Sequence, residues 1–136
     1  RSSDLMNERM AAGNVNEEYT LVTGQFDALL AKHGYRREGR YYRAEKPNHD
    51  TIVLFCHFGV EAVMLSHLLN CSPFVLWHGM VAQPSGVTEI YTEEREEGIA
   101  YFRMTVFGSV AHLTLNHEAP SFMARFAECY TDDTRK

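Results

Sequence analysis

"TIVLFC", residues 51–56, is a continuously apolar run that is rich in β-branched side chains. A strand with one face in water alternates apolar and polar residues, whereas a strand covered on both faces stays apolar throughout. The run therefore predicts a central strand with helices packed on both sides of its sheet. We expect an α/β fold, part of a three-layer αβα sandwich around a central, mostly parallel sheet.

The segments on either side of this run have helical periodicity. Apolar residues recur at helical spacing across residues 15–34, where Gly34 acts as a stop signal. They do so again across residues 59–70, which Asn70 can end. A strand that passes through a short glycine-containing turn into a helix is typical of α/β proteins.

The rest of the chain predicts smaller elements. Residues 39–46 read as a short strand, and residues 86–95 and 99–108 alternate as a β-hairpin around a charged, glycine-bearing turn. Residues 119–130 read as a closing helix. Together with the central strand, these elements predict a single domain over residues 1–136.

Composition excludes several classes of protein. The 136 residues are 45% hydrophobic and carry a formal charge of −5, without a basic cluster that would favour nucleic acid or an anionic membrane. No apolar stretch approaches the roughly 20 residues that span a bilayer. The three cysteines, Cys56, Cys71 and Cys129, have no CxxC spacing. Reduced thiols in a cytoplasmic protein fit them better than a disulfide framework.

His57 stands where the predicted strand ends and the next helix begins. Open α/β sheets bind ligands beyond the carboxyl ends of their strands, and helix N-termini favour anions. The amides of Phe58, Gly59 and Val60 would open that helix, so His57 predicts a phosphate pocket. The alternative is that His57 only forms a hydrogen bond with a neighbouring carbonyl in the core.

Several segments resemble the histidine phosphatase superfamily, the phosphoglycerate mutase-like proteins, in its C-terminal half. They are "TIVLFCHFGVEAVMLSHLLN" at 51–70, Trp77, "PSGVTEIYTEE" at 84–94 and "YFRMTVFGSVAHL" at 101–113, preceded by "NEEYTLVTGQFDALL" at 16–30. The resemblance implies two-step phosphoryl transfer through a phosphohistidine. It also implies that His57 is the second, phosphate-holding histidine, with the Phe58 amide as a further phosphate contact.

The family's nucleophile motif, Arg-His-Gly, does not occur in the 136 residues. "KHG" at 32–34 ends a predicted helix and "WHG" at 77–79 falls in a predicted loop, so neither follows a buried strand. We therefore expect the chain to be a fragment that is inactive alone. Its partners would be a small phosphorylated substrate, and either a missing N-terminal half or a second chain along the 51–56 strand edge.

Other functions stay open. A phosphoglycerate mutase-type phosphotransferase would use the same site, and a non-catalytic anion-binding or assembly module would keep the pocket without chemistry. The remaining histidines have no HxxxH spacing, so we expect no metal site and no cofactor. Cys56 adjoins His57, but successive strand side chains point to opposite faces, which argues against a Cys-His nucleophile pair.

Overall fold

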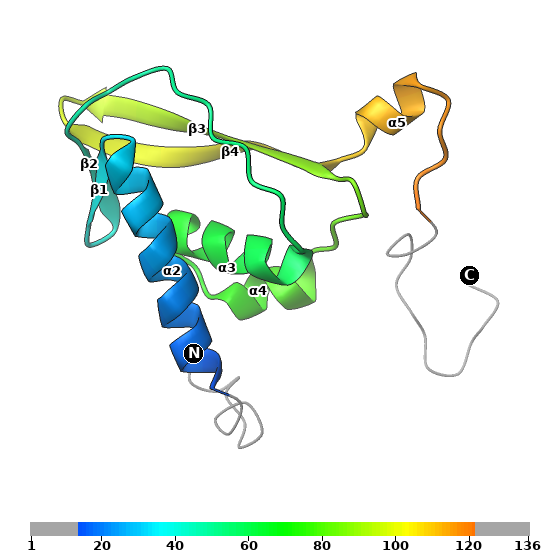
Figure 1. The fold of residues 1–136 in the computed structure, drawn as a ribbon, viewed down its shortest axis with the longest axis horizontal. Helices are drawn as coiled ribbons and strands as arrows, with labels where there is room; N and C mark the ends of the chain where they lie inside the picture. The colour runs from blue at the N-terminus through cyan, green and yellow to red at the C-terminus, as the bar shows by residue number, and fades with distance from the viewer. Residues whose placement is uncertain (1–13, 122–136) are drawn as a thin grey trace. The chain divides into compact units, whose positions relative to one another are not determined.

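The computed structural model describes residues 14–121, which divide into two compact units (Figure 1). Unit 1 comprises residues 14–80 and 92–103 of the described chain, and unit 2 comprises residues 81–91 and 104–121. The predicted closing helix at 119–130 lies mostly outside the described residues.

Unit 1 begins with helix α2 (Val15–Lys32), in agreement with the predicted helix at 15–34. Two glutamates lie in its first turn and Lys32 in its last, which complements the helix dipole. Asn14 is the N-cap residue, but its side chain makes no capping hydrogen bond. Gly34 ends the helix with a φ of 89°, and a Cβ there would lie 2.6 Å from the Lys46 carbonyl oxygen. This position therefore requires glycine.

The sheet is antiparallel and has four strands in the order β1-β2-β4-β3. Its strands are β1 (Tyr35–Glu38), β2 (Tyr41–Ala44), β3 (Val87–Glu96) and β4 (Ile99–Ser109). Tyr42 pairs with Arg37 on β1 and with Ala100 on β4. The predicted strand at 39–46 and the hairpin at 86–108 therefore form, while β1 is an additional strand.

Two helices follow the sheet's first hairpin in unit 1. Helix α3 (Phe58–Leu69) agrees with the predicted helix at 59–70, and Asn70 ends it in the left-handed conformation. Helix α4 (Pro73–Gly79) includes residues 77–79, which were predicted to lie in a loop. Figure 1 shows α2 beside the β1–β2 hairpin, and α3 is in contact with both α2 and α4.

The core of unit 1 lies where these helices meet the sheet. The buried apolar side chains come from α2, the first two strands, α3, α4 and the start of β4: Leu30, Tyr35, Tyr42, Ala44, Ala62, Val63, Leu65, Leu68, Phe74, Leu76 and Ala100. The Phe102 ring packs edge-on against Tyr42, with 4.9 Å between centroids. Such aromatic pairs stabilise a core beyond the area that they bury.

The predicted fold class is wrong. The sheet is antiparallel, and its hairpins β1–β2 and β3–β4 turn through Gly39-Arg40 and Glu97-Gly98, loops too short for the crossover that parallel strands need. Residues 51–56 lie in no strand. The interior strand β2 is already paired with β1 and β4, and residues 51–56 pair with none of the four strands. Since a strand without a hydrogen-bonded neighbour is not stable in water, this segment is coil.

Unit 2 contains the N-terminal half of β3, the C-terminal half of β4 and the short helix α5 (Ala111–Leu115). The Gly108 amide donates a hydrogen bond to Thr88 Oγ1 at 3.1 Å. A Cβ on Gly86 would lie 3.1 Å from the Gly108 Cα, so the backbone just before β3 approaches the end of β4 closely at this pair of glycines. His112 lies in α5, where it is exposed.

Candidate anion-binding site

His57 is the N-cap residue of α3, with extended backbone dihedrals of φ −87° and ψ 155°. Its carbonyl oxygen accepts a hydrogen bond from the Glu61 amide at 3.0 Å, which closes the first turn. Its ring is exposed and makes no hydrogen bond or ion pair with any described residue. The prediction that His57 ends a buried strand is wrong, because the residues before it are exposed coil. Its predicted position at the start of a helix is confirmed.

The first-turn amides of α3 provide the donors of the candidate site. Within residues 14–121, no backbone oxygen accepts a hydrogen bond from Phe58, Gly59 or Val60. Unpaired N–H groups and the helix dipole together favour an anion at such a place. Gly59 leaves open space, since a Cβ built there would have no atom within 4 Å. His57 and Phe58, the two predicted site residues, therefore lie together at this helix end.

Trp77 fixes the first turn of α3 from the neighbouring helix. Its indole Nε1 donates a hydrogen bond to the Gly59 carbonyl oxygen at 3.1 Å. The Phe74 ring packs edge-on against the indole, with centroids 5.2 Å apart. The prediction that residues 77–79 fall in a loop is therefore wrong, because they belong to helix α4. The contact holds the backbone of the candidate site without occupying its amides.

Two further groups set the electrostatics of this helix end. Partial burial raises the pKa of the Cys56 thiol, and the negative charge of Glu61 raises it further. A thiol with a raised pKa is a poor nucleophile at neutral pH. The raised pKa therefore argues against a nucleophilic pair of Cys56 and His57. The reason expected from strand geometry does not apply, because Cys56 lies in coil.

The other histidines do not join His57. His33 is the C-cap residue of α2, and its Nδ1 lies 2.9 Å from Asp50 Oδ2. His78 Nδ1 lies 2.9 Å from the Phe74 carbonyl oxygen, within α4. In the part of the chain that the structure describes, no three His, Cys, Asp or Glu residues are grouped so that they could hold a metal ion.

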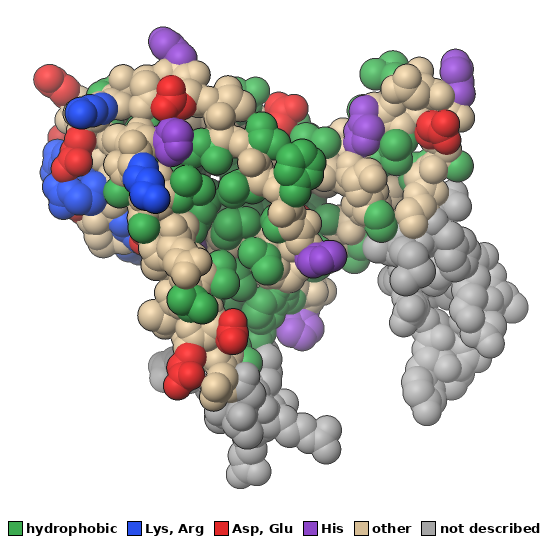
Figure 2. All heavy atoms as spheres, in the orientation of Figure 1, with side chains coloured by type: hydrophobic (Ala, Val, Ile, Leu, Met, Phe, Trp, Pro, Cys, Tyr) green, Lys and Arg blue, Asp and Glu red, His purple; other side chains and the backbone are tan. Residues whose placement is uncertain are grey.

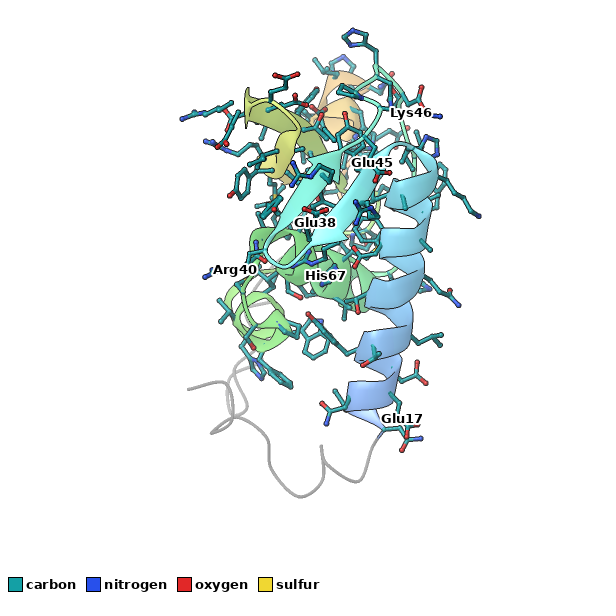
Figure 3. All side chains as sticks on the ribbon, turned by 90° about the vertical axis from the view of Figure 1, so that its left-hand side faces the viewer. Glu17, Glu38, Arg40, Glu45, Lys46 and His67 are labelled. Carbon is teal, nitrogen blue, oxygen red and sulfur yellow. The ribbon has the colours of Figure 1, made fainter. Side chains whose placement is uncertain are left out.

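A second cluster of polar residues lies at the opposite end of α3, around His67. Its Nε2 lies 2.8 Å from Asp27 Oδ2, and the Tyr42 hydroxyl donates to Asp27 Oδ1 at 2.7 Å. Arg37 donates to the Tyr42 hydroxyl, to the His67 carbonyl oxygen and to Asn70 Oδ1. Figure 3 shows His67 on α3 between the β1–β2 hairpin and α2. We name these five residues, Asp27, Arg37, Tyr42, His67 and Asn70, the polar junction.

The polar junction is a structural device. Burial raises the pKa of the Tyr42 hydroxyl well above its ordinary value, and its hydrogen bond to Asp27 acts in the same direction. Tyr42 is only 1% exposed, and within residues 14–121 no buried side-chain nitrogen or oxygen lacks a hydrogen-bond partner. This junction was not predicted from the sequence. His67 and Asn70 lie 30 to 40 positions away from their partners Arg37 and Asp27, and Tyr42 lies 15 positions from Asp27, so no local spacing could reveal the junction.

One open depression lies beside the C-terminal end of α3, with a volume of about 360 Å³. Glu93 lies at its rim between two arginines, where the hydrogen bond from Arg95, followed by that from Arg103, holds the pKa of this carboxyl below its usual range. A helix of 12 residues is about 18 Å long, so the depression and His57 are at opposite ends of α3. Its lining residues are Leu68, Leu69, Asn70, Glu93, Arg95, Tyr101, Phe102 and Arg103.

Comparison of the chain with known protein families, with curated proteins and with solved structures gives no match. Among the helices of residues 14–121, none combines the length and the apolar character required to cross a membrane. The candidate site must therefore be judged on its own geometry.

Proposed function

We propose that this chain is the phosphate-holding part of a phosphohydrolase of the histidine phosphatase type, acting on a small phosphomonoester. In this proposal His57 and the amide of Phe58 bind the phosphoryl group, and a nucleophilic histidine comes from polypeptide outside these 136 residues. The observation that carries the proposal is an exposed histidine without a partner in the described chain, next to three helix-opening amides without acceptors. The proposal rests on this local geometry and not on a parallel sheet.

The chemistry of phosphoryl transfer suits such an arrangement. Negative charge on the equatorial oxygens of the phosphoryl group requires donors that are already in place before reaction. Backbone amides at a helix N-terminus meet this need without reorganisation, and an imidazole beside them adds one more donor. A phosphoglycerate mutase-type phosphotransferase would use the same contacts, with a second hydroxyl group in place of water as acceptor.

A titration with inorganic phosphate tests the site directly. We expect the amide NMR signals of Phe58, Gly59 and Val60 to shift saturably, and the His57→Ala variant to weaken binding several-fold. The His49→Ala variant is the matched control, because His49 is also exposed and lies eight positions earlier in coil. Phosphate binding that is equal in all three proteins, or absent from the parent chain, contradicts the proposal.

A non-catalytic anion-binding or assembly module is the second candidate. The exposed histidine and the helix-opening amides support it equally, because holding an anion there needs no further catalytic group. Saturable phosphate binding without turnover of p-nitrophenyl phosphate fits both candidates for the isolated chain. Phosphohistidine formation after addition of a polypeptide that supplies an Arg-His-Gly motif distinguishes the phosphohydrolase.

A further inference from the structure

The open depression beside the C-terminal end of α3 combines apolar side chains with a charged rim. Leu68 and Leu69 from α3 and Phe102 from β4 contribute apolar surface to its lining. Leu68 is 6% exposed and Leu69 is 37% exposed, so this surface passes from the core of unit 1 to solvent. The volume of about 360 Å³ lies at the small end of the roughly 300–1,000 Å³ of ligand pockets. The depression therefore has room for a small molecule.

The charged residues of this lining leave one positive charge without a counterion. Glu93 lies 3.0 Å from Arg95 and 2.6 Å from Arg103, and each arginine contacts a different oxygen of its carboxylate. No other residue of the lining carries a formal charge, so two guanidinium groups share one carboxylate. The other N–H groups of both arginines make no hydrogen bond with any described residue. These donors and the excess charge favour a second anion.

The end of α3 does not oppose an anion as strongly as a bare helix C-terminus would. The last carbonyl groups of a helix carry partial negative charge. Here Arg37 donates a hydrogen bond to the His67 carbonyl oxygen at 2.9 Å, and Asn70 Nδ2 donates to the Leu68 carbonyl oxygen at 3.4 Å. Part of the negative end of the helix dipole is therefore already satisfied within unit 1.

We propose that this depression binds a small monocarboxylate with a flat apolar body. The carboxylate lies between Arg95 and Arg103, where its single negative charge balances the excess positive charge. The apolar body lies against Leu69 and the Tyr101 ring, which also lines the depression and is 49% exposed. The Tyr101 hydroxyl makes no hydrogen bond with any described residue, so it can donate to the ligand. This site is separate from the proposed phosphate site at the other end of α3.

A titration of the parent chain with 3-phenylpropionate, followed by NMR, tests the proposal. We expect the amide signals of Leu69, Tyr101 and Arg103 to shift saturably, with a Kd on the order of 1 mM because the site is open to solvent. Two further probes separate the contributions of the ring and of the charge. Propionate has the same head group without the ring, and 3-phenylpropylamine has the same ring with a positive charge. Both are expected to bind several-fold more weakly.

Variants of the rim test the role of the charges. Arg103→Gln removes the excess charge and is expected to weaken the binding of 3-phenylpropionate about two- to fivefold, as for an exposed charge pair. Glu93→Gln leaves both arginines without a carboxylate, so it is expected to strengthen binding by a similar factor.

The matched control comes from another pair of charges in unit 1. Figure 2 shows Lys and Arg side chains beside Asp and Glu side chains at the end of unit 1 that holds the β1–β2 hairpin. Arg36 on β1 is 53% exposed and pairs with Glu38 and Glu45, much as Arg103, which is 58% exposed, pairs with Glu93. Because Arg36 does not line the depression, Arg36→Gln is expected to bind 3-phenylpropionate as the parent chain does.

The proposal is overturned if 3-phenylpropionate gives no saturable shift, or if propionate or the amine binds as tightly. Equal affinities of Arg103→Gln and Arg36→Gln, or weaker binding by Glu93→Gln, also contradict it. The comparison of the three probes needs only the parent chain, so it stays decisive if a variant does not fold. Arg103→Gln should leave the phosphate-induced shifts of residues 58–60 intact, so this proposal and the proposed function can fail separately.

Discussion

The two ends of α3 differ in whether their residues find partners within the chain. At the C-terminal end, the polar junction satisfies an aspartate, an arginine, a tyrosine and a histidine with one another. At the N-terminal end, the apolar segment 51–57 is exposed and its residues before His57 make no hydrogen bond with the described chain. Burial here follows the availability of a partner more closely than it follows hydrophobicity, because backbone and side-chain groups alike must be satisfied.

Truncating one apolar residue at each end gives the largest contrast. Leu65 in α3 is 2% exposed, so Leu65→Ala is expected to lower the free energy of unfolding by about 2–5 kcal/mol through cavity formation. Phe55→Ala, although it removes a larger side chain, is expected to change it by less than about 0.5 kcal/mol. Urea denaturation at low protein concentration measures both. A loss of stability in Phe55→Ala comparable with that in Leu65→Ala means that segment 51–57 is packed in the monomer.

Removing the donor that connects the polar junction gives the next largest effect. Arg37 donates to three groups of the junction and to the Gly39 carbonyl oxygen, so Arg37→Met leaves partly buried acceptors unpaired. The expected loss in the free energy of unfolding is about 2–3 kcal/mol. Arg40→Met, an exposed arginine three positions later, is the control, with an expected change of less than about 0.5 kcal/mol. Equal denaturation midpoints for the two variants contradict the structural role of the junction.

Tyr42→Phe tests the hydroxyl of the junction at a smaller cost. Without that group, the bonds with Asp27 and Arg37 are lost, and the free energy of unfolding is expected to fall by about 1–2 kcal/mol. Tyr101→Phe is the control, because Tyr101 is 49% exposed.

The raised pKa of Tyr42 also predicts how the free energy of unfolding depends on pH. Between the ordinary pKa of 10.0 and the folded value, the unfolded chain binds fewer protons than the folded one, so stability falls as pH rises.

We expect this loss of stability at alkaline pH to come from Tyr42 alone. The stabilisation is fully present below pH 10.0 and declines as pH rises from there toward the higher folded value. Denaturation of the parent chain and of Tyr42→Phe, followed on both sides of that pH, should show a smaller decline in the variant. The same decline in both proteins would assign the pH dependence to other groups.

Local pattern predicted the elements well and their partners badly. The helices at 15–34 and 59–70 and the hairpin at 86–108 follow from periodicity, stop residues and turn residues, all of which act within a few positions. Residues 51–56 show the opposite case. Their apolar character fits a strand buried on both faces, but a strand exists only where neighbours offer hydrogen bonds, and sequence cannot count those neighbours.

The candidate site was predicted for a reason that is partly wrong. His57 does stand at the start of a helix, because helix periodicity begins directly after it. Its predicted place at the end of a sheet strand depended on long-range pairing, which the antiparallel sheet overturns. Trp77 and the polar junction escaped prediction for a related reason, since they act through residues 15 or more positions away in α3, α2 and β2.

The smallest expected effect concerns the reactivity of Cys56, at the exposed end of the comparison. Because burial and then Glu61 raise the pKa of this thiol, its rate of alkylation by iodoacetamide should rise toward its plateau at a higher pH than that of glutathione. The Glu61→Gln variant should move the profile part of the way back, since the charge is the lesser of the two causes. Mass spectrometry of the peptide that contains Cys56 separates its rate from those of Cys71 and Cys129. A profile that coincides with that of glutathione would contradict the raised pKa. It would show that this end of α3 is as open to solvent as a free peptide, unlike the polar junction at the other end.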